Sequence, residues 1–450
     1  MQAPAFNLRN LLILVALSAT GVALANSALQ KPAVQVDPIE RLATIKPGFG
    51  PASQAAALEA TAGAMALARE RIARRPGDWL NQEGYARASM ARFRLTGDYA
   101  DLTAAQGALD RAEKSTPSDS GPMLTDAVFA ATTHNLDRLD RRLGGIARMA
   151  IMAQPEERAE AVALVGDLDF YSGRYDSALR HYQQAAALAD GPGIAFRLGR
   201  YHQRTGDSDA AIGYFASAAN KTRAKSPQFL SSVWLQVGVV ELERGNWESA
   251  ERHFARADAL FPGFWLNQAH LAQMRAVRGD IAGARAAYTR IATRSGNPEV
   301  MDALAALYRA DGNAPQSRYW SGRASAIWEE RLKLLPQAAY GHALDHQMLF
   351  GDAQTALDLA RKNFAARPYG DSAILLAWAY LANGQAAKAK TVLETLGRTK
   401  WQSAQQHAAL AEAYAMLGQG KASEREREKA MAVNPKIFDP AAPMIWFGHH

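Results

Sequence analysis

The hydrophobic and polar positions of this chain follow the period of an amphipathic helix, most clearly between Ser231 and Pro262. Two apolar-rich runs, SSVWLQVGVVELER and WESAERHFARADAL, are separated by a short polar turn that contains Gly245. Apolar residues three or four positions apart give each run one face to bury, and a glycine between the runs allows a left-handed end to the first helix. Pro262 follows the second run, and proline cannot continue a helix. The segment therefore predicts two helices packed against each other.

Small and large residues have fixed places in this pair. We expect Trp234 to wedge the first helix against the second, and Phe254 and Ala257 to face back into the pair. Gly238 and Ala250 are small, which suits the point where the two helices cross most closely. The pattern thus predicts the packing of the pair as well as its helices.

The same pattern recurs along the chain from about Glu157 to Pro435. Equivalent turn glycines are spaced by about 33 to 39 residues. They are Gly173, Gly206, Gly245, Gly279, Gly312, Gly351, Gly384 and Gly418. Each is followed by the small and aromatic positions of a second helix, as in Ala178, Tyr182 and Ala185. The unit around Gly351 and Pro368 is degenerate. Seven or eight units in register indicate a repeat protein.

This pattern resembles the tetratricopeptide repeat (TPR) family. The resemblance implies an all-α, right-handed superhelical solenoid of about nine or ten helix-turn-helix repeats. It also implies a protein built to bind a protein or peptide partner rather than to catalyse a reaction. Because each repeat of a solenoid packs on its neighbours, 450 residues can form one elongated body without a central core.

The repeat pattern is weaker outside this range. Residues 51–156 are interpreted as degenerate N-terminal repeats, with a long helical run over 51–75 as a cap and a turn at His134-Asn135. Residues 26–50 hold several prolines and predict an extended lead-in. The repeats proper span 157–435, and 436–450 form a C-terminal tail.

The first 25 residues resemble a secretory signal. Arg9 precedes an apolar run, Leu11–Leu17, and Ala23 and Ala25 form a small-residue cleavage site. The chain has no cysteine, which excludes disulfides and a lipid-modified N-terminal cysteine. We therefore expect export to the periplasm, with an uncleaved inner-membrane anchor as the alternative.

The charge of the chain points away from nucleic acid. The formal net charge is +7, and basic residues are scattered among acidic ones over the whole length. Nucleic-acid binders gather their basic residues into patches. A mixed solvated surface is the simpler interpretation, while weak contact with a membrane surface or an acidic envelope polymer stays open.

No catalytic motif stands out, and we expect no cofactor and no enzymatic activity. One local feature is unusual: His342 and His346 lie four positions apart, so a helix places them on one face, where two imidazoles can bind a metal ion. The sequence does not identify the third ligand such a site needs. The alternative to a metal-dependent binding or hydrolytic module is that both histidines pack and hydrogen-bond against the long preceding helix with Trp320 and Trp328.

By the register of the TPR family, certain residues of the first helices line the concave groove of the superhelix. An apolar floor with a few arginines suits an extended peptide or a helix that carries carboxylates. These residues are Phe196, Arg200, Arg204, Leu235, Val239, Gln273, Arg309 and Trp378. Solvated lining without a ligand is the alternative.

The favoured function is a non-enzymatic, exported scaffold in cell-envelope assembly, secretion or polymer export. A polysaccharide-binding solenoid is another reading, because exposed aromatic residues stack on sugars.

Overall fold

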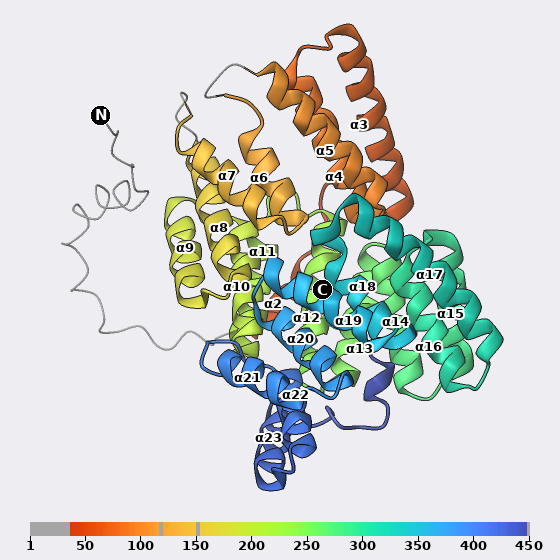
Figure 1. Cartoon of the computed structure of the whole chain (residues 1–450). Helices are drawn as coiled ribbons and strands as arrows, with labels where there is room; N and C mark the ends of the chain where they lie inside the picture. The colour runs from red at the N-terminus through yellow and green to blue at the C-terminus, as the bar shows by residue number, and fades with distance from the viewer. Residues whose placement is uncertain (1–36, 117–119, 150–153, 448–450) are drawn as a thin grey trace, which may run out of the picture.

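The computed structural model describes residues 37–116, 120–149 and 154–447, and in these ranges the regular structure is entirely helical (Figure 1). The helices are α2 (Pro38–Thr44), α3 (Gln54–Arg74), α4 (Trp79–Thr96), α5 (Tyr99–Ser115), α6 (Met123–Thr132), α7 (Leu136–Ile146), α8 (Pro155–Tyr171), α9 (Tyr175–Leu188), α10 (Pro192–Arg204), α11 (Ser208–Lys221), α12 (Pro227–Glu243), α13 (Trp247–Leu260), α14 (Trp265–Val277), α15 (Ile281–Ser295), α16 (Pro298–Ala310), α17 (Ala314–Leu334), α18 (Pro336–Phe350), α19 (Ala353–Ala366), α20 (Gly370–Ala382), α21 (Ala386–Leu396), α22 (Ala404–Met416), α23 (Gly420–Val433) and the 3₁₀ helix η1 (Ala442–Met444).

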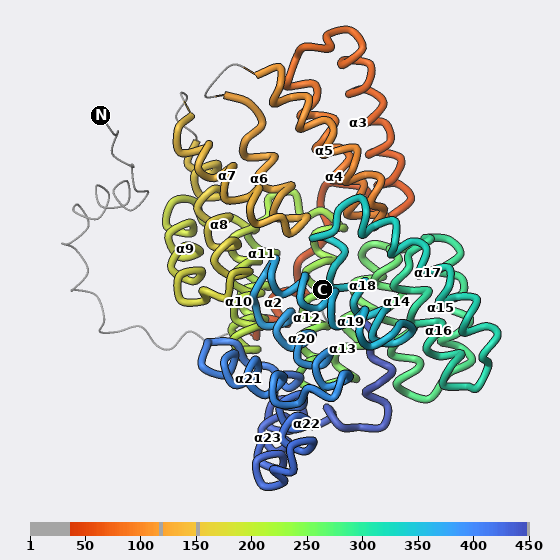
Figure 2. Tube along the Cα trace, viewed as in Figure 1, coloured from red at the N-terminus to blue at the C-terminus, as the bar shows by residue number. Residues whose placement is uncertain are grey.

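Within the described chain the helices form successive pairs, from pair 1 (α4 and α5) to pair 10 (α22 and α23). The two helices of a pair pack on each other, and each pair packs on the next along the chain (Figure 2). This arrangement confirms the predicted all-α solenoid and its number of repeats. The helix α3 packs on α4 ahead of pair 1.

Pair 5 shows why the sequence folds into this unit. A Cβ atom placed on Gly238 in α12 would lie 2.5 Å from the ring of Phe254 in α13, so only glycine fits at this crossing. Ala250, Phe254 and Ala257 are all buried between the helices. Gly245 in the turn has a φ of 81°, the left-handed conformation that favours glycine. The predicted register of the repeat is therefore confirmed.

Replacing Gly238 with alanine is expected to lower the free energy of unfolding by about 1–3 kcal/mol, because the new methyl group overpacks the crossing. Gly213, on α11, supplies the matched control, since a Cβ there meets nothing within 4 Å. Gly213→Ala should raise stability by about 0.5–1 kcal/mol through its better helix propensity. Urea denaturation of both variants measures the difference, and equal effects would contradict the packing described for Gly238.

The superhelix closes on itself. The turn between the two helices of one pair contacts the loop that follows the pair five places later in the chain. The turn of pair 4 meets the loop after pair 9, where Gln402 N donates to Arg204 O at 3.1 Å. The turn of pair 3 likewise meets the segment after pair 8, where Gly370 N donates to the Tyr175 hydroxyl at 2.9 Å. In the same way Lys436, after pair 10, lies over the Trp247 ring of pair 5. The first and last five pairs are thus held together by contacts remote in sequence.

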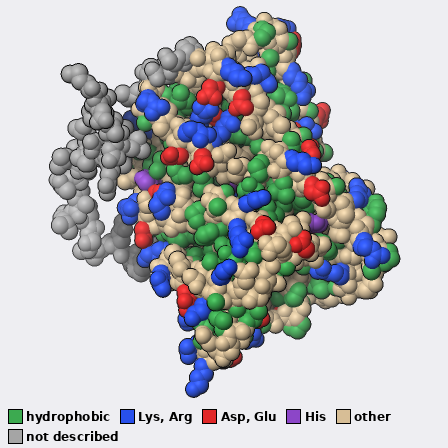
Figure 3. Space-filling view, in the orientation of Figure 1, with side chains coloured by type: hydrophobic (Ala, Val, Ile, Leu, Met, Phe, Trp, Pro, Cys, Tyr) green, Lys and Arg blue, Asp and Glu red, His purple; other side chains and the backbone are tan. Residues whose placement is uncertain are grey.

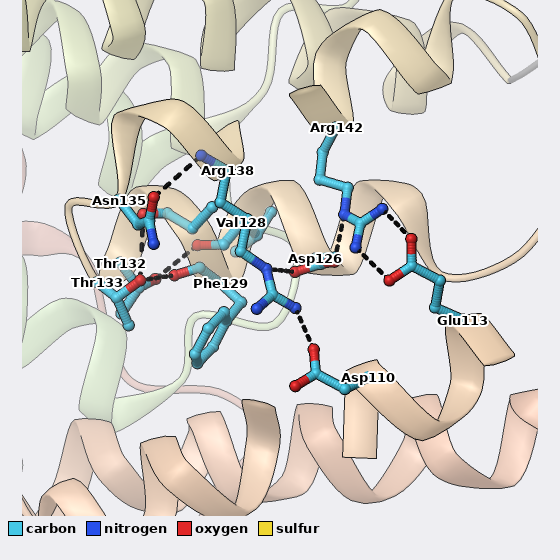
Figure 4. Close-up of polar contacts among 11 residues, drawn as sticks. Asp110, Glu113, Asp126, Val128, Phe129, Thr132, Thr133, Asn135, Arg138 and Arg142 are labelled. Atoms are coloured by element: carbon cyan, nitrogen blue, oxygen red, sulfur yellow. Dashed lines mark hydrogen bonds and ion pairs between the residues drawn. The ribbon is translucent and has the colours of Figure 1, made fainter. Parts of the chain in front are cut away.

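A network of charged residues joins the second pair to the first. The carboxylate of Asp126 on α6 is buried and accepts hydrogen bonds from Arg138 and Arg142 of α7 (Figure 4). Arg138 also pairs with Asp110 at 2.9 Å, and Arg142 with Glu113, both on α5. The hydrogen bond from Arg142 lowers the pKa of Glu113 below its usual value. This network joins pair 2 to pair 1 and explains how a degenerate repeat stays in the stack.

The segment before the repeats differs in part from the extended lead-in that its prolines predict. It contains the helix α2, which packs on α11 and buries Leu42 in the same core cluster as Leu235. After α2 the chain is extended, and Gly48 N and Phe49 N donate to Lys225 O and Ala224 O. The predicted signal at 1–25 lies outside the described residues. Within the described residues, each helix is either too short or too polar to serve as a transmembrane span.

Candidate functional site

The C-terminal segment, residues 441–447, lies along the interior face formed by first helices of the repeats. Its residues Ala441, Ala442, Met444 and Ile445 pack on the core cluster that contains Leu235 and Val239 of α12. Those two α12 side chains are 4% and 0% exposed. The groove expected at these positions is therefore covered by the chain itself. We use "groove" for the interior surface around Leu235, Val239, Gln273, Arg309 and Trp378.

Gln273 on α14 holds the backbone of this segment. Its side-chain oxygen Oε1 accepts hydrogen bonds from Trp446 N at 2.7 Å and from Phe447 N at 2.6 Å. Gln273 is 0% exposed and Phe447 is 1% exposed, so both hydrogen bonds are shielded from water. The Phe447 ring lies 5.8 Å from the ring of His270 and 6.1 Å from that of Tyr288. One buried amide thus binds two successive main-chain N–H groups while an aromatic pocket takes the side chain.

Further along the groove, Arg309 of α16 and Trp378 of α20 line one cavity of about 460 Å³. Leu307, Leu375 and Met348 contribute its apolar wall, and the C-terminal segment from Pro443 to Trp446 closes one side. Arg309 stacks over the Phe350 ring at 4.9 Å and donates to Leu349 O. An apolar wall beside one arginine, next to a bound segment of chain, suits a peptide.

The remaining predicted groove residues divide into two groups. Phe196 packs against Phe215 and Phe229 at centroid distances of 5.1 and 6.3 Å, inside the stack of repeats. Arg204 is buried, pairs with Glu243 at 2.8 Å, and lies 3.8 Å from Asp371. Arg204, predicted to line the groove, is therefore held by two carboxylates of the chain itself. Arg200 is half-buried and faces a second space.

This second space, called the interior cavity below, has a volume of about 340 Å³. It lies between the first and last five pairs, and its walls come from α8, α10, α18, α19, α20 and α22 and the α6–α7 turn. Arg200, Arg204, Trp378 and His342 all line it. Four predicted residues from three repeats are therefore brought to one place.

The two histidines are held by neighbouring side chains. His346 Nδ1 lies 2.7 Å from Asp302 Oδ1, and Trp328 Nε1 donates to Asp302 Oδ2 at 2.8 Å. The His342 ring stacks on Trp328 with centroids 6.1 Å apart. In the part of the chain that the structure describes, no three His, Cys, Asp or Glu side chains lie together as a metal site requires. His342 thus packs against the long helix α17, while His346 is held by Asp302 of α16.

Asp345, on the same helix as the histidines, has the most perturbed carboxyl group among these side chains. Burial raises its pKa to about 8, and the carboxylates of Glu299, Asp302 and Asp371 add to the shift. Asp345 lines both the groove cavity and the interior cavity. Near pH 7 its carboxyl group is largely protonated and can donate a hydrogen bond.

Arg367 and Asp371 were not predicted from the sequence. Arg367 follows α19 of the degenerate repeat, and Asp371 lies in the first turn of α20 in the next repeat. The C-terminal segment was predicted only as a tail. The available signal was the apolar run Met444–Phe447 beyond the last repeat, which a solvated tail does not need.

The surface outside these cavities has mixed charge. Figure 3 shows basic and acidic side chains interspersed over one face of the molecule, with hydrophobic side chains near its middle. Such a surface agrees with the expectation of a mixed solvated exterior.

Paired helices that stack along the chain, with a left-handed glycine in most of the turns, define a TPR-like helical repeat protein. No family model matches the chain, and no curated protein matches it. Among solved structures, yeast Tom70 is similar at 14% identity, over 90% of this chain and 93% of that one, with a TM-score of 0.43. The quorum sensor NprR of B. thuringiensis in its apo form is similar at 12% identity, over 84% and 97%, with a TM-score of 0.40. A tetratricopeptide repeat protein from Parabacteroides merdae is similar at 13% identity, over 56% and 98%, with a TM-score of 0.34.

Proposed function

We propose that this protein is a non-enzymatic scaffold that binds an extended peptide of a protein partner in the groove. The observation that carries the proposal is the pair of hydrogen bonds from Trp446 N and Phe447 N to Gln273. They support the proposal because they hold a stretch of the chain's own backbone in the groove. Main-chain hydrogen bonds supply affinity for any extended peptide, and adjoining pockets select side chains.

The partner peptide should carry two adjacent aromatic residues. Phe447 fills an aromatic pocket beside His270 and Tyr288, and Trp446 closes the cavity that contains Arg309 and Trp378. Aromatic anchors in buried pockets contribute most of the energy of such interfaces. Arg309 beside this cavity favours a peptide with a carboxylate near the aromatic pair.

Binding of the chain's own segment in trans tests this function. A chain that ends at Pro440 is expected to bind a labelled synthetic peptide of residues 441–450, measured by fluorescence anisotropy. The full-length protein should bind it at least tenfold more weakly, because its tethered segment has an effective concentration of the order of mM. Equal binding by the two chains would show that the segment does not cover the site.

A variant of the truncated chain tests the role of Gln273. Gln273→Met keeps the volume but removes the acceptor, and two hydrogen bonds of about 0.5–1.5 kcal/mol each should be lost, a weakening of about tenfold or more. Gln354→Met, at an exposed position of α19, is the control and should bind as the truncated chain does. Circular dichroism verifies that each chain is folded. A folded truncated chain that does not bind the peptide would contradict the proposal.

We further propose that the scaffold is exported and acts in the bacterial cell envelope, in assembly, secretion or polymer export. The support is the signal-like pattern of residues 1–25 and the absence of cysteine. The mature chain should begin at Asn26, which N-terminal sequencing of the native protein measures. An intact Met1 in the membrane fraction would indicate an anchor. Crosslinking in cells with mass spectrometry would identify the partner.

A further inference from the structure

The interior cavity holds more positive charge than the protein itself balances. Arg367 is 6% exposed; its Nε donates to Asn363 Oδ1 at 3.1 Å and its guanidinium lies over the Tyr369 ring. Among the described residues, neither Arg367 nor Arg200 forms an ion pair with a carboxylate. Arg204, in contrast, is paired with Glu243. Buried cations without partners are costly, which favours an anion between them.

The acidic side chains of the cavity do not cancel this charge. Asp371 lies beside Arg204, at 3.8 Å. Burial and the neighbouring carboxylates raise the pKa of Asp345 to about 8, so its carboxyl group is largely neutral at pH 7. With Arg204 paired to Glu243, the charges of Arg200 and Arg367 exceed that of Asp371 by one, and they face a space of about 340 Å³. The geometry leaves room for a ligand that supplies the missing negative charge.

His134 adds a polar group without a partner. Its φ of 53° is left-handed, which is uncommon and strained for a residue other than glycine. Its Nδ1 atom is buried and makes no hydrogen bond to the described residues. Burial, Arg367 and Arg200 lower the pKa of its imidazole well below the usual value, so the ring is neutral. The left-handed conformation belongs to the turn of pair 2, where most other pairs have glycine, and the unpaired buried nitrogen points to a binding site.

Aromatic side chains form another part of the wall. The rings of Tyr171 and Tyr369 are 5.2 Å apart and meet edge to face, and Tyr171 also contacts His134 at 4.9 Å. Trp378 faces the same cavity. The volume of the interior cavity falls at the lower end of the range for small-molecule sites, about 300–1,000 Å³.

We propose that the interior cavity binds a small organic acid built on a six-membered ring. The carboxylate lies between Arg200 and Arg367, the ring lies against Tyr171, Tyr369 and Trp378, and His134 bonds a polar substituent. This site goes beyond the peptide groove, because Arg200 and Arg367 line the interior cavity and not the groove cavity that the C-terminal segment closes. Two sources share this chemistry, a uronic acid and an aromatic acid, and the probes below distinguish them.

Isothermal titration calorimetry of the full-length protein with sodium glucuronate and with sodium benzoate tests the site. At least one acid should bind with a 1:1 stoichiometry. Its neutral analogue, glucose or benzamide, should bind at least tenfold more weakly because it lacks the charge. The acid that binds more tightly shows whether the cavity prefers a uronic acid or an aromatic acid. Failure of both acids to bind, or equal binding of acid and neutral analogue, would overturn the proposal.

Two variants locate the binding. Arg200→Gln should weaken binding of the acid at least tenfold, because Arg200 is half-buried and has no ion pair to lose. Arg318→Gln, at an exposed position of α17, should bind as the wild type does. Unchanged binding by a folded Arg200→Gln variant would overturn the assignment. Inorganic phosphate that binds as tightly as the ring acid would show an anion site without ring recognition, which also overturns it. The peptide assay of the groove is independent of each outcome.

Discussion

Replacing Trp401 with alanine is expected to lower the free energy of unfolding by about 3–5 kcal/mol, the usual range for a large buried aromatic residue. Trp401 lies in the loop after pair 9 and is fully buried. Its ring centroid is 5.8 Å from that of Tyr175 and 6.2 Å from that of Phe170, both in pair 3. It also lies against Gly370, where no Cβ would fit. Its loss should therefore separate the first and last five pairs.

The shape of the unfolding curve distinguishes this loss from ordinary destabilisation. We expect Trp401→Ala to unfold in two stages in urea and to have a larger radius of gyration in small-angle X-ray scattering. Trp320→Ala is the matched control, because Trp320 is also buried but belongs to the local packing of α17. It should lower stability while keeping a single transition. Identical curves for the two variants would contradict the coupling of distant pairs.

Asp345→Asn should raise stability at alkaline pH by about 3 kcal/mol. Burial and three neighbouring carboxylates raise the pKa of Asp345 to about 8, above its usual value of 3.8. Between these values the folded state holds a proton that the unfolded state releases, so wild-type stability falls as pH rises. A shift of one pKa unit corresponds to about 1.36 kcal/mol of stability. We expect roughly half of the value that the whole shift of Asp345 would give, because water in the cavities screens the charge.

The advantage of Asp345→Asn should be small near pH 4, grow up to about pH 8 and then stay constant. Asparagine mimics the protonated carboxyl group, so it has no charge to bury at any pH. Urea denaturation between pH 4 and pH 9 measures the profile. Asp140→Asn, at an exposed position of α7, is the control and should leave the profile as in the wild type. A constant difference at every pH would contradict a raised pKa at Asp345.

The helix pairs could be predicted from the sequence because each is encoded locally. The crossing of Gly238 with Phe254 and the left-handed turn at Gly245 depend on residues less than 20 positions apart. Even the degenerate pair 2 was predicted from its His134-Asn135 turn. The register also indicated Arg200 and Trp378, and the spacing of the two histidines indicated His342. The structure places all three around the interior cavity.

Contacts between distant pairs could not be predicted from the same pattern. The turn glycines look alike in sequence, yet a Cβ on Gly206 would lie 2.9 Å from Gln402, while one on Gly384 would meet nothing within 4 Å. The approach of Asp371 to Arg204 depends on the same closure, whereas Glu243 belongs to the next pair along the chain. The C-terminal segment covers Leu235 and Val239 through packing of residues about 200 positions further along the chain. None of these contacts is encoded by the spacing of residues within a repeat.

The closure of each turn onto the loop five pairs later has a consequence for how this protein can evolve. In an open solenoid, duplication or loss of one repeat adds or removes a module and leaves the others in place. Here, loss of a pair between α12 and α19 would shift every later loop by one step. Gln402 would then no longer face Arg204, and Gly370 would no longer reach Tyr175. Such a change would break several contacts at once, so we expect the number of repeats to vary at the ends of the chain and to be constant between them.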